Sequence, residues 1–108
     1  MRLNVHAGKV PSDLLVFELN LENDELFLHG DPAGLRRLAA LLTKLADVAE
    51  GGKFPHEHLF TPAWGGGELS SQPQEKGHHS VNHVKIYGWP NTAGAMPYNR
   101  SDDSAADL

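Results

Sequence analysis

The longest regular pattern of apolar positions runs from Asp31 to Gly51 and predicts a single long helix. Its apolar side chains recur at spacings of three and four residues, which places on one stripe Leu35, Leu38, Leu41, Leu42, Leu45, Val48 and Ala49. Asp31 is typical of an N-cap, and Pro32 suits the first helical position. The Gly51-Gly52 pair is a typical helix end. We expect a sheet to cover this stripe, because one helix cannot bury its own apolar face.

Alternating apolar and polar positions predict strands on both sides of the helix. Before the helix we expect strands at Leu3–Val5, Leu14–Asn20 and Glu25–His29, with a turn at Asn23-Asp24. After the helix we expect strands at His56–Phe60 and Val81–Tyr87, with a possible short strand at Glu68–Ser70 and a surface loop at Ser71–Ser80. The order strand-strand-strand-helix-strand-strand predicts an α+β fold, in which one long helix packs on one face of a mostly antiparallel sheet of about five strands.

The other face of that sheet is then either solvated or covered by a partner. In the strand at 14–20, the alternation places Leu15, Phe17 and Leu19 on one face and Leu14, Val16 and Glu18 on the other. We expect function to lie on the face that the helix leaves open.

Composition narrows the possible functions. The 108 residues predict one domain over residues 1–90, followed by an acidic, disordered tail at 91–108. The net charge of −5 argues against nucleic-acid binding, which relies on clustered basic charge. We expect no membrane span and no signal peptide, and therefore a cytoplasmic location. The chain has no cysteine, which excludes disulfides, thiolate metal ligands and a thiol nucleophile.

The histidines are the most specific candidates for chemistry. His56 and His58 alternate, so both imidazoles face one side of their strand about 7 Å apart. With His83 on a neighbouring strand, the three could bind one zinc ion. The alternative is that they are solvated or hydrogen-bonded side chains on the open face, since no spaced metal signature accompanies them. His78-His79 lies in a polar loop and is less specific still.

No pattern predicts catalysis. Glu57 or Glu68 beside a histidine could act as an acid–base group, but no spaced carboxylate pair or nucleophile elbow is present. A set of His58, His83 and Lys85 can also be assembled, but only by selection among seven histidines. We therefore expect no enzymatic activity and no cofactor.

Two segments have features of a protein-binding surface. The Trp64-Gly65-Gly66-Gly67 loop lacks the Lys-Ser/Thr of a phosphate loop, so its glycines suit a close backbone approach or a flexible connector. The outward row of the last strand has the mixed aromatic composition of protein interfaces, in His83, Lys85, Tyr87 and Trp89. The same aromatic residues could instead fill the second face of the sheet, and the sequence alone leaves both possibilities open.

Three segments taken in order resemble the immunity protein 32 family of bacterial polymorphic-toxin systems. They are Gly30–Leu38, the run from His56-Glu57-His58-Leu59 to Trp64-Gly65-Gly66-Gly67-Glu68-Leu69-Ser70, and His83-Val84-Lys85-Ile86-Tyr87-Gly88-Trp89-Pro90. The resemblance extends from about Leu14 to Pro90. It implies a small α+β protein that binds the effector domain of a cognate toxin and blocks it without doing chemistry.

The two lines of reasoning predict an inhibitor that acts by protein–protein occlusion. The expected contact residues are His56, His58, Trp64, Glu68, His83, Lys85, Tyr87 and Trp89. The alternative is a metal-binding module or metal-dependent enzyme that uses His56, His58 and His83. The residues do not decide whether the chain associates with itself.

Overall fold

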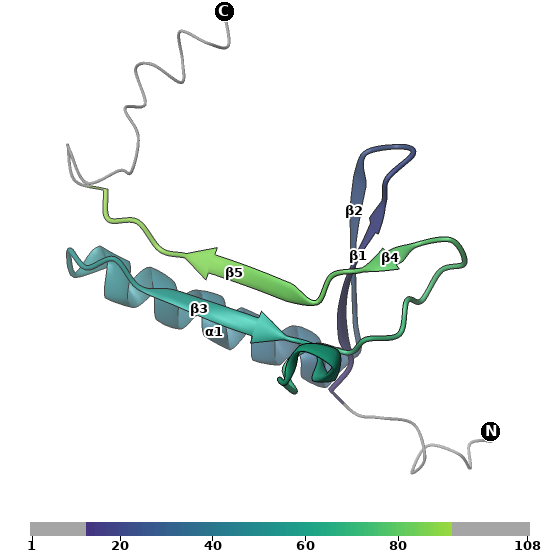
Figure 1. Cartoon of the computed structure of the whole chain (residues 1–108). Helices are drawn as coiled ribbons and strands as arrows, with labels where there is room; N and C mark the ends of the chain where they lie inside the picture. Colours follow the sequence, from purple (N-terminus) through teal and green to yellow (C-terminus); the bar gives the residue numbers. More distant parts are fainter. Residues whose placement is uncertain (1–12, 92–108) are drawn as a thin grey trace, which may run out of the picture. The chain divides into compact units, whose positions relative to one another are not determined.

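The computed structural model describes residues 13–91, which fold as one long helix and five strands (Figure 1). The elements in chain order are β1 (Leu15–Asn20), β2 (Glu25–Gly30), α1 (Pro32–Glu50), β3 (His56–Phe60), the 3-10 turn η2 (Pro62–Trp64), β4 (His79–Ser80) and β5 (His83–Tyr87). The predicted α+β class, the long helix and the antiparallel strands are confirmed. The strand expected at Leu3–Val5 and the tail expected after residue 91 lie outside the described residues.

The strands form two sheets rather than one. β1 is the central strand of a three-stranded sheet with the order β2-β1-β4, and β3 pairs with β5 in a second, two-stranded sheet (Figure 1). The chain changes sheet at two consecutive residues between β4 and β5. The Val81 amide donates to the Phe17 carbonyl oxygen at 2.7 Å, whereas the Asn82 carbonyl oxygen accepts from the Thr61 amide at 3.0 Å.

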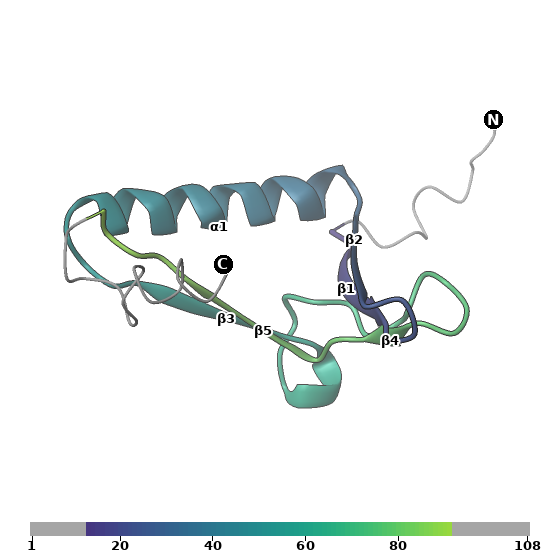
Figure 2. The ribbon, with the colours of Figure 1, turned by 90° about the horizontal axis from the view of Figure 1, so that it is seen from above.

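Contacts group the described residues into two compact units. The first unit contains residues 13–40 and 58–84, and the second contains residues 41–57 and 85–91. α1 contributes residues to both units and is drawn as one continuous helix (Figure 2). The expectation of a single domain over residues 1–90 stays a prediction.

The start of α1 follows the sequence pattern. Asp31 Oδ1 accepts a hydrogen bond from the Gly34 amide at 2.7 Å, and Asp31 Oδ2 accepts from the Asp13 amide at 2.7 Å. The Gly34 bond is that of an N-cap, because the first amides of a helix have no partner within the helix, and the Asp13 bond ties the residues before β1 to the same carboxylate. The amide bonds, that of Gly34 foremost, hold the pKa of Asp31 below its usual value.

The buried stripe of α1 is narrower than predicted. Leu38, Leu45 and Ala49 are buried, but Leu35 and Leu42 each keep more than two fifths of their surface exposed. Leu35 and Leu42 are seven residues apart and therefore lie on the same edge of the stripe. The apolar spacing alone therefore predicted a wider buried stripe, because it included one row of side chains that is about half exposed in the structure.

The β1–β2 hairpin contains the largest fully buried side chains of the first unit. Its antiparallel register runs from Leu15 opposite Gly30 to Asn20 opposite Glu25. Leu15 and Val16 point to opposite faces, and both are fully buried. The sheet is therefore covered on both faces at this end of β1, whereas we expected the face without the helix to be solvated or covered by a partner.

The short strand expected at Glu68–Ser70 does not form, and β4 lies instead at His79–Ser80, inside the expected surface loop. The Ser70 amide does donate to the Leu15 carbonyl oxygen at 2.8 Å, but this is a single bond and not a ladder. β4 pairs with β1 through Glu18 opposite Ser80 and Leu19 opposite His79. No helix among residues 13–91 is long and apolar enough to cross a membrane.

Candidate functional site

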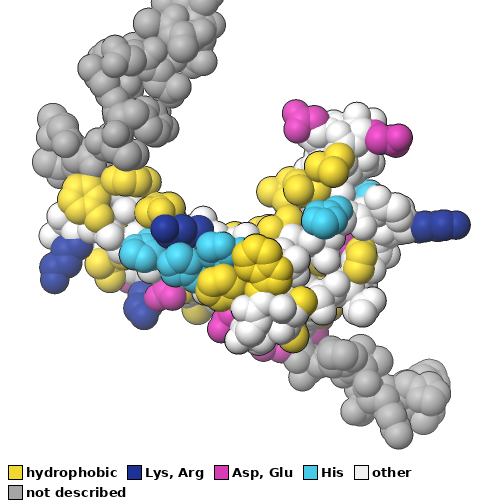
Figure 3. Space-filling view, viewed as in Figure 1, with side chains coloured by type: hydrophobic (Ala, Val, Ile, Leu, Met, Phe, Trp, Pro, Cys, Tyr) yellow, Lys and Arg dark blue, Asp and Glu magenta, His cyan; other side chains and the backbone are white. Residues whose placement is uncertain are grey.

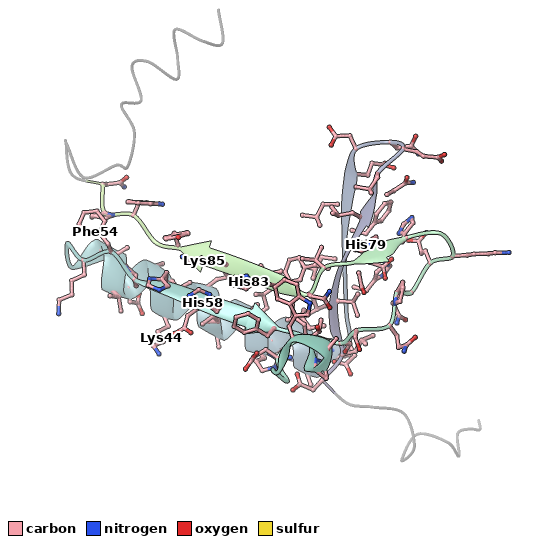
Figure 4. All side chains as sticks on the ribbon, viewed as in Figure 1. Lys44, Phe54, His58, His79, His83 and Lys85 are labelled. Atoms are coloured by element: carbon pink, nitrogen blue, oxygen red, sulfur yellow. The ribbon has the colours of Figure 1, made fainter. Side chains whose placement is uncertain are left out.

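The first unit carries a stacked cluster of aromatic rings, here called the His83 cluster, which comprises His58, Phe60, Trp64 and His83. The Nδ1 atom of His58 lies 2.8 Å from Nε2 of His83, and the two rings stack with centroids 5.0 Å apart (Figure 4). The ring of Phe60 stacks on His83 at 4.4 Å, and that of Trp64 lies 6.4 Å from it. A hydrogen bond between two imidazoles needs one donor and one acceptor, so at least one ring offers a lone pair.

The local sequence places Trp64 at the exposed edge of this cluster. Thr61 precedes η2 in an extended conformation, Pro62 begins the turn, and Gly65 ends it with a left-handed φ of 86°. Gly66 lies so close to Phe60 that an added Cβ would be 2.4 Å from the Phe60 Cβ. The glycine loop is thus packed against β3, and it leaves Trp64 60% exposed.

Glu68 fixes the end of the same loop. Its Oε1 atom accepts a hydrogen bond from the Phe60 amide at 3.0 Å, and Arg37 Nη2 donates to the Glu68 carbonyl oxygen at 2.8 Å. The Phe60 amide, with a smaller contribution from the Arg37 charge, holds the pKa of Glu68 below its usual value. Glu68 therefore has a local role in holding the loop that carries Trp64.

The second unit carries another group of rings, here called the Tyr87 cluster, which comprises Phe54, His56, Tyr87 and Trp89. The ring of Tyr87 lies 5.6 Å from that of His56 and 5.8 Å from that of Trp89. Phe54 meets Trp89 edge-on at 5.6 Å, and Lys85 Nζ lies 4.8 Å from the centre of the Tyr87 ring. Phe54 and Tyr87 are about half exposed.

An open groove of about 650 Å³ lies beside the Tyr87 cluster in the second unit. Its lining includes Leu42, Leu45, Ala49, Ile86 and Trp89. The half-exposed Leu42, which fell outside the buried stripe, lines this groove. The space-filling view shows both hydrophobic and histidine side chains at the molecular surface (Figure 3).

The structure thus distributes the eight expected contact residues between the two units. His58, Trp64, Glu68 and His83 belong to the first unit, and His56, Lys85, Tyr87 and Trp89 to the second. Within the first unit, His58 and His83 meet directly, as a shared zinc ligand set would require, but the bond between their nitrogens is a hydrogen bond. A zinc site formed by these two residues and His56 stays a prediction, and so does the assignment of the contact residues.

Sequence reasoning missed a polar cluster in the first unit. Glu18, which the alternation placed on the same face as Leu14 and Val16, is fully buried. Burial alone would raise the pKa of Glu18, but hydrogen bonds from the Gln74 amide and His78, with the nearby His29, lower it below its usual value. The only signal in the sequence was an acidic residue inside an otherwise apolar strand, because its partners lie more than fifty residues further along the chain.

A comparison with protein-family models matches residues 25–88 to immunity protein 32. This is the family that the sequence segments resembled, and the match includes β2, α1, β3, η2, β4 and β5. Neither the curated proteins nor the solved structures contain a significant match to the chain. Since the family model covers more than half of the sequence, the chain belongs to the immunity protein 32 family.

Proposed function

We propose that this protein binds the effector domain of a cognate bacterial toxin in the cytoplasm and blocks it by protein–protein occlusion. Membership of an immunity protein family supports a role in toxin immunity, with a toxin as the general partner. An inhibitor of this kind needs complementary contact and no chemistry, which agrees with the lack of a catalytic pattern in the sequence.

The observation that carries the proposal is the exposure of Trp64. Trp64 lies at the end of a short, hydrogen-bonded turn, and 60% of its surface is exposed to solvent. Such exposure is unusual for a large apolar side chain. Tryptophan and tyrosine are the most frequent energetic anchors of protein interfaces, because a large rigid ring buries much area with little loss of conformational freedom. Trp64 already has its loop fixed by Glu68 before any partner binds.

The other rings of the His83 cluster extend the surface around Trp64 that a partner could contact. Its flat rings are stacked, so a partner would meet a preformed surface and would not need to order it on binding. The imidazoles add hydrogen-bonding groups around the apolar anchor. A stable inhibitory complex would bury roughly 1,200–2,000 Å² in total, so residues beyond this cluster must contribute. The Tyr87 cluster and its groove are the candidates within the second unit.

The proposal is tested by co-expressing the chain with the toxin domain that its neighbouring reading frame encodes. We expect growth to be rescued and the two proteins to copurify. Trp64→Ala should weaken the complex by about thirtyfold, which corresponds to about 2 kcal/mol for an interface anchor. Tyr87→Ala, measured in the same assay, tests the contribution of the second unit.

Leu21→Ala is the matched control, because Leu21 is also a large apolar side chain that is mostly exposed, on the turn between β1 and β2. It should leave the affinity within about twofold of the wild-type value. A correctly folded wild-type protein that neither rescues growth nor binds the toxin domain would refute the proposal. Equal losses in the Trp64 and Leu21 variants would refute the assignment of Trp64 as the anchor.

A further inference from the structure

We propose that Glu18, His29, Glu75 and His78 form a structural zinc site in the first unit. The proposal is independent of toxin binding, because none of these residues belongs to the His83 cluster. Among residues 13–91, one group of three His, Asp or Glu side chains brings its ligand atoms within 4.8 Å of one another, and it consists of Glu18, Glu75 and His78. His29 approaches both carboxylates of that group and is the fourth candidate ligand.

Two separations between ligand atoms match those of a tetrahedral zinc site, and a third is shorter, at hydrogen-bond length. Zinc–nitrogen and zinc–oxygen bonds of 2.0–2.2 Å place neighbouring ligand atoms of a tetrahedron about 3.3–3.6 Å apart. His78 Nδ1 lies 2.9 Å from Glu18 Oε1, and His29 Nε2 lies 3.5 Å from Glu18 Oε1. His29 Nε2 also lies 3.5 Å from Glu75 Oε2. Glu18, Glu75 and His78 already bring one ligand atom each within 4.8 Å of the others, and His29 would have to move toward them to complete the set.

Backbone geometry explains why these four residues meet. On the β1–β2 hairpin, Val16 is opposite His29 and Glu18 is opposite Phe27, so Glu18 and His29 project from the same face. Glu75 and His78 belong to one tight turn, in which the His78 amide donates to the Glu75 carbonyl oxygen at 3.2 Å. β4 follows this turn directly and pairs with β1. Two ligands therefore come from the hairpin and two from the turn beside it.

The surroundings orient the ligands as the outer shell of a metal site does. The Gln74 amide donates to Glu18 Oε2, which leaves Oε1 directed at the two imidazoles. The ring of Phe27 lies 4.6 Å from that of His78 and 6.4 Å from that of His29. Phe27 thus packs against the ring of His78 and lies beside that of His29.

One atom of the cluster lacks the partner that its burial demands. His29 Nε2 is buried, yet it makes no hydrogen bond to any of the described residues. It lies near two carboxylate oxygens, and a buried nitrogen of this kind normally has a bonded partner. A zinc ion between the imidazoles and the carboxylates would satisfy it directly.

The chemistry of the donors favours zinc over harder cations. Two imidazole nitrogens and two carboxylate oxygens suit zinc, whereas calcium and magnesium prefer ligand sets made of oxygen alone. Two carboxylates also balance the charge of a divalent ion at a buried position. The site is closed on one side by Glu18 and His78, whose side chains are 0% and 8% exposed, and is reached from solvent past Glu75, whose side chain is 47% exposed. Four protein ligands that leave no coordination position open are typical of structural zinc.

The test measures binding of Zn²⁺ to the full chain, purified without a polyhistidine tag, by calorimetry and by metal analysis after dialysis. We expect one zinc ion per chain and a rise in Tm when zinc is added. Glu75→Gln should weaken zinc binding by about tenfold or more, since even changes to outer-shell partners cost that much. Because the Glu75 side chain is 47% exposed, we expect this variant to fold as the wild-type chain does. His78→Ala should abolish stoichiometric binding.

Matched controls separate this site from the other histidines. His79→Ala removes an exposed imidazole next to His78, and Glu22→Gln neutralises an exposed carboxylate on the β1–β2 turn. Both should bind zinc as the wild-type chain does. The proposal is overturned if the folded wild-type chain binds no stoichiometric zinc, or if Glu75→Gln and His78→Ala bind it unchanged. Loss of zinc in His58→Ala with retention in Glu75→Gln would overturn it in favour of the histidines on β3 and β5.

Discussion

Replacing Gly34 by alanine reverses the usual effect of that substitution in a helix. Gly34 lies in the first turn of α1, where alanine would ordinarily stabilise the helix by about 0.5–1 kcal/mol. Here an added Cβ would lie 1.9 Å from the Leu14 carbonyl oxygen and 2.7 Å from the Leu14 carbonyl carbon. We therefore expect Gly34→Ala to destabilise the protein.

The size of the effect follows from what the new methyl group would displace. Ordinary contacts of a Cβ begin at 3.4 Å, so the Leu14 carbonyl would have to move by more than an ångström. The same oxygen accepts a hydrogen bond from the Asp31 amide at 3.2 Å, and Asp31 also caps the helix through Gly34. Overpacking costs about 1–3 kcal/mol, and the propensity gain offsets less than about 1 kcal/mol of it. The expected net loss is about 1–2 kcal/mol.

Thermal and urea unfolding followed by circular dichroism measures this loss. For a domain of this size, about 1–2 kcal/mol lowers Tm by roughly 5–15 °C. Gly67→Ala is the control, because a Cβ at Gly67 would meet nothing within 4 Å and its φ is not left-handed. That variant should unfold within about 2 °C of the wild-type protein. If Gly34→Ala raises Tm, the close approach of Leu14 to the helix is wrong.

Two further predictions concern buried and capping polar groups. Thr61 is fully buried, and its Oγ1 donates a hydrogen bond to Asn82 Oδ1 at 2.7 Å. Thr61→Val keeps the shape of the side chain but removes this bond, so it should lower the free energy of unfolding by about 1 kcal/mol. An unchanged midpoint in urea unfolding would contradict this. The pKa values of Asp31 and Glu68 are lowered in the folded state, so the unfolded chain binds protons more readily, and stability should fall as the pH drops below about 4. Asp31→Asn and Glu68→Gln should each flatten that fall, and curves parallel to the wild-type curve would show that the two carboxylates do not contribute.

The helix and the first hairpin could be predicted because their signals are local. Asp31, Pro32 and the glycine pair at 51–52 mark the ends of α1 by side-chain and backbone chemistry that needs no distant partner. The turn before β2 is likewise set by its own residues, with Asp24 at a positive φ of 55°. Elements of this kind depend on neighbours within a few positions along the chain.

The division into two sheets could not be predicted because it depends on distant pairing. β4 is two residues long and has no apolar alternation, so only its bonds to β1 define it. The change of sheet at Val81 and Asn82 depends on carbonyl and amide groups more than twenty residues away in the chain. Backbone amide and carbonyl groups are the same in every residue, so the sequence does not indicate which strand they will pair with.

The candidate sites show the same contrast. His58 and His83 were each placed on a strand by alternation, and on the assumption that these strands are neighbours they were expected to converge; they do meet on β3 and β5. The burial of Glu18 was not predicted because alternation indicates which face a side chain points to, and not whether that face is covered. The turn that covers Glu18 contains Glu75 and His78, and its sequence is typical of an ordinary polar loop.

The two sites of the first unit are joined by a short stretch of backbone, which makes their independence a question for experiment. His78 leads through β4 to Asn82, and Asn82 bonds both the amide and the side chain of Thr61, the residue that precedes the turn carrying Trp64. A metal that fixed His78 to the hairpin would therefore restrain the base of the Trp64 turn through covalent and hydrogen-bonded links. Physical connection of this kind permits coupling but does not require it. The His78→Ala and Trp64→Ala variants resolve the point when each is measured for both zinc and toxin binding, since independent sites would each lose only their own ligand.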